Sequence, residues 1–163
     1  RFRVVLLRDT GAPLAPFNAW QIIQGLETVG LRMKQHCANA EKVVTFLETQ
    51  KKVKNVIYPT NHQGEIKERA KKYLQGGNGA LVGADLGTAE AGAKFIDNLK
   101  MLYHVANIGD ARSLAIHPAT TTHSQLNEKE LLAAGVTPGY VRLSIGIEHP
   151  DDIIADIKQA LAA

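Results

Sequence analysis

The sequence predicts an α/β fold: a small sheet of about four strands, covered by helices and preceded by a long helical arm. Two observations support this fold class. From residue 53 onward, short runs rich in aliphatic residues alternate with amphipathic helical patterns. Before that point, residues 16–50 show helical periodicity only. With 163 residues, the chain is long enough to bury a core of its own.

Composition and charge exclude several classes of protein. The net charge is only +3, and the lysines alternate with acids, as in residues 65–72, so no basic patch for nucleic acid stands out. A single cysteine excludes an internal disulfide framework. No apolar run approaches the roughly 20 residues of a membrane span. We therefore expect a cytoplasmic protein that binds neither nucleic acid nor membrane.

The first part of the chain is expected to be helical. After a loop at residues 9–16, the pattern predicts a long, kinked arm over residues 16–50. Gly25 weakens the first helix near its end, and Thr28 can cap a second one. Cys37 falls on the apolar stripe of the second helix, which favours a small buried thiol over a nucleophile.

The remaining elements are short and alternate in type. Strands are predicted at 53–59, 80–86, 104–107 and 140–147, with a further extended piece at 114–118. Helices are predicted at 64–75 and 89–102, from residue 127 to about Gly135, and from Pro150 onward.

Local signals mark several of these boundaries. Thr88 can cap one helix, and Asn127–Glu130 has the form of a capping box. The glycine-rich residues 75–79 follow a helix and precede a strand, the reverse of a phosphate-binding loop, so a turn is the better interpretation. In the strand at 80–86, small residues such as Gly83 would let another layer approach closely.

Arg142 is the most informative polar residue. Along its strand, Val141, Leu143, Ile145 and Ile147 alternate with polar or small residues, so one face is core and Arg142 projects from the other. A guanidinium there suits a carboxylate or a phosphate. The alternative, a structural ion pair with an acid on a neighbouring strand or domain, stays open.

Two other polar clusters precede Arg142. Asn107-Ile108-Gly109-Asp110 combines an amide with a turn, which by itself is a weak signal. His117 and His123 lie six residues apart on a loop, a spacing that matches no zinc pattern, so both are expected to make loop hydrogen bonds. No nucleophile–base pair or paired-carboxylate pattern occurs. We therefore expect no catalytic or metal residues in this chain.

The start of the chain is unusual. It begins at Arg1, and its first methionine is Met33. The apolar run at residues 2–7 has the form of the end of an element that began earlier. We expect this chain to be a fragment of a longer protein.

Four segments, residues 15–28, 107–114, 116–126 and 141–148, closely resemble the C-terminal part of the Cys/Met-metabolism pyridoxal-phosphate enzymes. The resemblance spans nearly the whole chain and is nearest to the branch that acts on O-acetylhomoserine. It implies the aspartate-aminotransferase-like (type I) fold. Residues 51–163 would be its small C-terminal domain, and residues 1–50 the end of the large domain with the connecting helices. The N-terminal, cofactor-binding large domain would be absent from this chain.

The same resemblance assigns roles to two residues. The arginine at the position of Arg142 grips the α-carboxylate of the substrate, and the residue at the position of Asn107 helps to hold it. Many relatives carry serine there, whereas asparagine is similar to the acetylhomoserine branch. The cofactor lysine lies in a Ser-x-Thr-Lys-like segment that does not occur here. The fragment alone is therefore expected to be inactive.

For the parent protein the resemblance implies γ-replacement: acetate leaves O-acetylhomoserine, and sulfide or a thiol adds, with sulfide giving homocysteine for methionine biosynthesis. Pyridoxal 5'-phosphate would be the cofactor, and a homo-oligomer, a dimer of dimers, the assembly. Cystathionine γ-synthase and methionine γ-lyase activities remain alternatives within the family. A stand-alone module that binds an amino-acid carboxylate through Arg142 is an alternative of another class.

Overall fold

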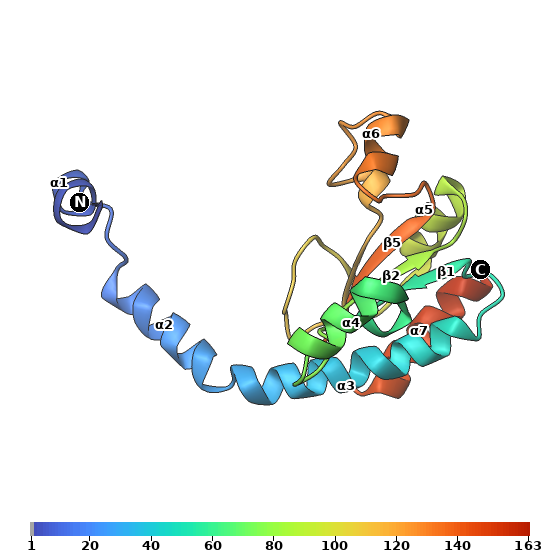
Figure 1. Cartoon of the computed structure of the whole chain (residues 1–163), viewed down its shortest axis with the longest axis horizontal. Helices are drawn as coiled ribbons and strands as arrows, with labels where there is room; N and C mark the ends of the chain where they lie inside the picture. The colour runs from blue at the N-terminus through green and yellow to red at the C-terminus, as the bar shows by residue number, and fades with distance from the viewer. Residues whose placement is uncertain (1) are drawn as a thin grey trace. The chain divides into compact units, whose positions relative to one another are not determined.

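A computed structural model describes residues 2–163; Arg1, the first residue of the predicted terminal segment, lies outside them. The chain divides into two compact units, Arg1–Leu31 and Arg32–Ala163. Figure 1 labels the α-helices of each unit and the strands β1, β2 and β5, and its colours follow the chain from the N-terminus to the C-terminus. The predicted division of the parent enzyme at residue 50 concerns domains of a longer protein and stays a prediction.

The first unit is helical. It contains a π-helix η1 (Phe2–Leu7), the short α1 (Arg8–Thr10) and α2 (Pro16–Glu27). The predicted loop begins at Gly11, whose left-handed backbone ends α1, and it leads to Pro16 in the first turn of α2. The predicted arm over residues 16–50 is two helices, α2 and α3 (Val29–Glu48), with Thr28 between them in a non-helical conformation.

The second unit contains a five-stranded sheet in the order β1-β2-β5-β4-β3. All neighbouring strands are antiparallel except β3 and β4, which are parallel. The count exceeds the predicted four because the extended piece at 114–118 does pair. The strands are β1 (Asn55–Ile57), β2 (Leu81–Asp85), β3 (Tyr103–His104), β4 (Leu114–Ile116) and β5 (Tyr140–Ser144).

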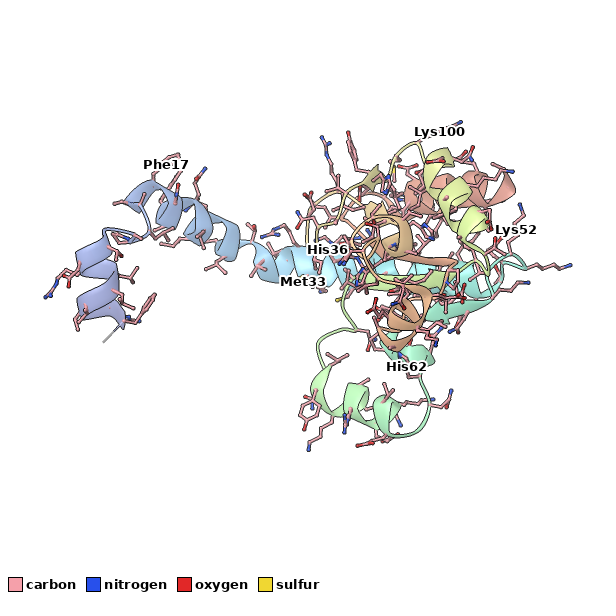
Figure 2. The ribbon with its side chains drawn as sticks, turned by 90° about the horizontal axis from the view of Figure 1, so that it is seen from above. Phe17, Met33, His36, Lys52, His62 and Lys100 are labelled. Carbon is pink, nitrogen blue, oxygen red and sulfur yellow. The ribbon has the colours of Figure 1, made fainter. Side chains whose placement is uncertain are left out.

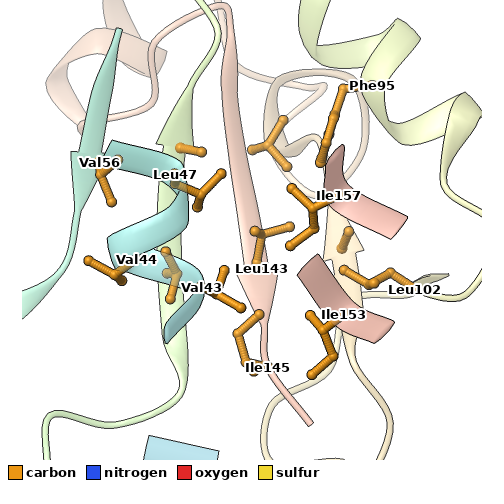
Figure 3. Close-up of a cluster of buried hydrophobic side chains, with 14 of the residues drawn as sticks. Val43, Val44, Leu47, Val56, Phe95, Leu102, Leu143, Ile145, Ile153 and Ile157 are labelled. Atoms are coloured by element: carbon orange, nitrogen blue, oxygen red, sulfur yellow. The ribbon is translucent and has the colours of Figure 1, made fainter. Parts of the chain in front are cut away.

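The core lies on one face of this sheet. Val141 and Leu143 of β5, and Ile145 beyond it, are fully buried, as the alternation predicted. Figure 3 shows Leu143 and Ile145 in one cluster with side chains of α3, α5 (Ala89–Asn98) and α7 (Pro150–Ala162), among them Leu47, Phe95 and Ile157. The prediction was wrong for Ile147, which lies past the end of β5 and is 37% exposed.

Two helices of the second unit begin at the predicted capping residues. Thr88 accepts a hydrogen bond from the Ala91 N–H, and Asn127 and Glu130 form a complete capping box. None of the helices between residues 2 and 163 combines the length and the apolarity that a membrane crossing requires. The elements are η2 (Pro59–Asn61), α4 (Gly64–Tyr73), α5 (Ala89–Asn98), η3 (Pro118–Thr120), α6 (Glu128–Ala133) and α7 (Pro150–Ala162).

Helix α5 ends at Asn98, four residues earlier than predicted, and Asp156 of α7 gives the physical reason. Its buried carboxylate accepts hydrogen bonds of 2.9–3.0 Å from the backbone N–H groups of Lys100, Met101 and Leu102. Those amides donate to α7 and not to helix carbonyls, so the chain leaves the helix and turns toward β3. This contact ties α7 to the edge of the sheet.

We predict that Asp156→Asn weakens this connection. Burial opposes ionisation of Asp156, but the three backbone donors and Gln159 outweigh it and hold the pKa of the carboxyl below its ordinary value. The variant should raise the hydrogen-exchange rate of amides 100–102 about 10- to 100-fold, since a charged hydrogen bond contributes roughly 1–3 kcal/mol.

The pH dependence follows from the sign of the shift. Because the folded pKa lies below the unfolded one, the stabilisation is present above the unfolded pKa and is lost as the pH falls through the folded pKa. The difference between wild type and variant should therefore shrink in acid. Asp152→Asn, an exposed acid of the same helix, is the control. Equal exchange rates in wild type and Asp156→Asn at neutral pH would contradict this role.

Candidate functional site

Arg142 lies on the middle strand of the sheet. Its Cα pairs with Gly83 of β2 on one side and with Ile116 of β4 on the other. Its neighbours Val141 and Leu143 point into the helical core, so Arg142 projects from the opposite face. A strand held on both sides gives the guanidinium a rigid base.

Only some of the hydrogen-bond donors of the guanidinium have a partner in the protein. Nη2 donates to the backbone carbonyl of Asn107 across 3.5 Å, and the buried Nε has no hydrogen-bond partner in the part of the chain that the structure describes. Within residues 2–163, no acid pairs with Arg142. An unsatisfied buried donor is costly, by roughly 1–3 kcal/mol, and more when the group is charged. The arrangement therefore favours an anionic partner from outside the described residues.

Asn107 lies in the connection between β3 and β4, and its backbone carbonyl accepts the hydrogen bond from Arg142. Its side-chain oxygen accepts from the Ile108 N–H at 2.9 Å, which closes a turn that continues through the left-handed Gly109. The residue is exposed. The structure thus joins the two predicted site residues through the Asn107 backbone carbonyl, while the amide NH₂ of Asn107 stays available.

The loop that carries Asn107 is fixed by a network at the end of β5. The Glu148 carboxylate accepts from the N–H and the hydroxyl of Ser113, at 2.6 and 2.9 Å. The Ser113 hydroxyl accepts from the Gly146 N–H at 2.8 Å. From α3, Asn39 donates to the carbonyls of Gly146 and Glu148. These bonds hold the segment before β4 and the segment after β5 in a defined position relative to each other.

His36 extends this network. It lies on α3 where the helix meets the rest of the second unit (Figure 2), and its Nδ1 is 2.6 Å from the Ile145 carbonyl. A carbonyl only accepts, so Nδ1 carries the proton in this contact. The ring is fully buried, and it therefore secures the backbone beyond β5 and is not itself presented to a ligand.

A cavity of about 490 Å³ opens beside Arg142. The room comes from Gly83 of β2, because a Cβ there would stand 2.6 Å from the ring of Tyr140. Burial raises the pKa of the Tyr140 phenol, and the charge of Arg142 opposes that rise. Ser144 at the end of β5 and Gly146 beyond it are buried. Tyr140 was not recognised in the sequence as part of the site.

The other polar candidates have structural roles. His117 is buried; Nδ1 contacts the Thr120 hydroxyl, and Nε2 lies 2.7 Å from the Pro138 carbonyl. His123 contacts Thr122. Cys37 is half-buried against Gly77, as a packing thiol would be. Within residues 2–163, no cluster of three His, Cys, Asp or Glu side chains is placed to hold a metal ion.

The site defines a class of protein: an α/β domain whose central strand presents an arginine that no acid among residues 2–163 pairs with. No lysine is among the residues lining the cavity at Arg142. The chain belongs to the Cys/Met metabolism PLP-dependent enzymes, whose family model matches residues 3–162. The residues that line this cavity do not fit the cofactor itself, whose aldehyde needs a lysine.

Known relatives are similar along the whole chain. An O-acetyl-L-homoserine sulfhydrylase of Leptospira meyeri is 52% identical over 161 residues, which cover 98% of this chain and 36% of that protein. A sulfhydrylase of Fusarium oxysporum is 49% identical, covering 98% and 37%. The chain therefore spans less than two fifths of the length of these relatives.

The fold is also that of a solved relative. The crystal structure of a Campylobacter jejuni protein described as an O-acetylhomoserine (thiol)-lyase matches with a TM-score of 0.92 and 44% identity. The match covers all of this chain and 39% of that one, in which a lysine carries a pyridoxyl phosphate group. This likeness confirms that the chain has the fold of part of a pyridoxal-phosphate enzyme.

Proposed function

We propose that the protein carrying this chain is an O-acetylhomoserine sulfhydrylase, a transferase that replaces the acetate at the γ-carbon of O-acetylhomoserine with sulfide to give homocysteine. Relatives at 47–52% identity that are named for this activity support the proposal. The structural observation that carries it is the partly satisfied guanidinium of Arg142 beside Asn107.

Arg142 would bind the α-carboxylate of the amino-acid substrate. Its planar fork can donate two parallel hydrogen bonds, which fix the direction of the carboxylate as well as its position. The amide NH₂ of Asn107 can add a further donor. Because both residues are anchored, by β5 and by the Ser113–Glu148 network, the bound amino acid would be held in one orientation relative to the reacting groups.

The cofactor would be bound mainly by parts of the protein outside this chain. When bound, pyridoxal phosphate supplies the electron sink for carbanion chemistry. Under this proposal residues 51–163 are the small C-terminal domain, and residues 1–50 are the end of the large domain with its connecting helices. We further propose that the intact protein is a homotetramer, built as a dimer of dimers, and that it is located in the cytoplasm. The chain alone would have no activity.

An acceptor comparison tests the proposed function. The intact protein should convert O-acetylhomoserine and sulfide to homocysteine with a kcat/KM at least about tenfold higher than for cysteine as acceptor, because differential transition-state binding sets specificity. Homocysteine and cystathionine are measured by mass spectrometry. A preference for cysteine would indicate a cystathionine γ-synthase, and elimination without either product would indicate a γ-lyase.

We predict that Arg142→Lys weakens binding of the amino-acid substrate by roughly 1–3 kcal/mol, because lysine keeps the charge but loses the fork. The apparent affinity of the intact protein for O-acetylhomoserine measures the change. Arg112→Lys is a matched control, since Arg112 is exposed and packs over the Tyr103 ring at 4.8 Å. An unchanged affinity of Arg142→Lys for O-acetylhomoserine would contradict the assignment of Arg142 as the carboxylate-binding residue.

A further inference from the structure

We propose that a second cavity, on the helical side of the sheet, binds a small organic anion with an apolar body, of the class of medium-chain carboxylates. This cavity lies between α5, the end of α7 and the turn that follows α3, and its volume is about 350 Å³. It shares no lining residue with the cavity beside Arg142. The inference is independent of the proposed function.

The floor of this second cavity belongs to the hydrophobic core. Leu86, Phe95, Ala160 and Leu161 line it, and each of these side chains is at most 8% exposed. An apolar group seated against them would remove its own surface and part of theirs from water, which favours binding.

Short side chains leave the room between the helices. Ala91 of α5 and Ala160 of α7 both line the cavity. The end of α7 lies beside the turn that follows α3 (Figure 1), where Lys52 Nζ donates to the Leu161 carbonyl. This bond ties the end of α7 to the turn, so the mouth of the cavity has a defined shape.

The mouth of the cavity is positively charged. Lys51, Lys52 and Lys54 line it from the turn after α3, which Figure 2 marks with the label of Lys52, and Lys94 lines it from α5. Among the described residues, the lining includes no Asp or Glu side chain. Within residues 2–163, none of the four lysines forms an ion pair.

The acids closest in sequence to these lysines have other partners. The Asp85 carboxylate accepts from the Gly87 N–H at 2.8 Å, and the Glu48 carboxylate accepts from the Asn61 side chain at 2.9 Å. Like charges around one opening repel each other, and a bound anion would relieve that repulsion. A cation would add to it.

The size of the cavity limits the apolar body of the ligand. A volume of about 350 Å³ lies at the lower end of the range for small-molecule sites, about 300–1,000 Å³. One short aliphatic chain fits such a volume better than a lipid with two long chains. A single carboxylate at the lysines, with its chain against Phe95 and Leu161, matches both the charge and the lining.

The experiment compares three probes by titration calorimetry with the intact protein. Decanoate should bind at least about tenfold more tightly than hexanoate, because each methylene moved from water onto an apolar wall favours binding about fourfold. Decyltrimethylammonium, which has a similar chain and the opposite charge, should bind at least about tenfold more weakly than decanoate.

Two variants locate the decanoate. Lys54→Met combined with Lys94→Met should weaken its binding at least about fivefold, since each exposed ion pair contributes up to about fivefold. Lys100→Met combined with Lys158→Met removes the same charge from exposed lysines outside the cavity and should leave the affinity unchanged. Ala91→Leu, which fills the cavity without changing its charge, should weaken decanoate binding at least about fivefold.

Arg142→Lys separates the two cavities. Decanoate should bind this variant as tightly as it binds wild type, because the second cavity does not include Arg142. Decanoate binding that is lost in Arg142→Lys and kept in the Lys54/Lys94 variant would overturn the proposal. Equal binding of decanoate and decyltrimethylammonium, or an affinity unaffected by Ala91→Leu, would overturn it as well.

Discussion

The site depends on a cation, Arg142 on the central strand, that no acid between residues 2 and 163 pairs with. Among the described residues, Arg142 donates one long hydrogen bond, to the Asn107 carbonyl, and its buried Nε has no partner. Such a group lowers stability unless something anionic completes it. The fold can bear this cost, because β5 is paired with β2 and β4 and its other face is packed in the hydrophobic core.

The surrounding structure keeps this arginine and its neighbours in place. Asp156 joins α7 to the segment before β3, and Ser113 with Glu148 joins the segment before β4 to the segment after β5. From α3, His36 and Asn39 bind the carbonyls that follow β5. These contacts are polar, yet they position elements that the hydrophobic core alone would leave free to slide. Binding sites gain precision from such preorganised support.

Much of the second unit could be predicted from the sequence, because its signals are local. The capping residues Thr88 and Asn127 and the alternation around Arg142 depend on neighbours a few residues away. The early end of α5 could not be predicted, because its cause, Asp156, lies more than fifty residues further along the chain. Gly83 was noted as a place of close approach, but only the strand register shows that Tyr140 fills it beside Arg142. The alternation of buried and exposed residues holds only where the strand is paired, and Ile147, which lies past the end of β5, does not follow it.

The most direct test of the central claim is a crystal structure of the intact protein with a bound α-amino acid. The account predicts a ligand carboxylate oxygen about 2.7–3.2 Å from a guanidinium nitrogen of Arg142, the normal range for such a bond, with the Asn107 turn alongside. A ligand carboxylate bound elsewhere, with Arg142 paired to an acid from another part of the protein, would contradict it.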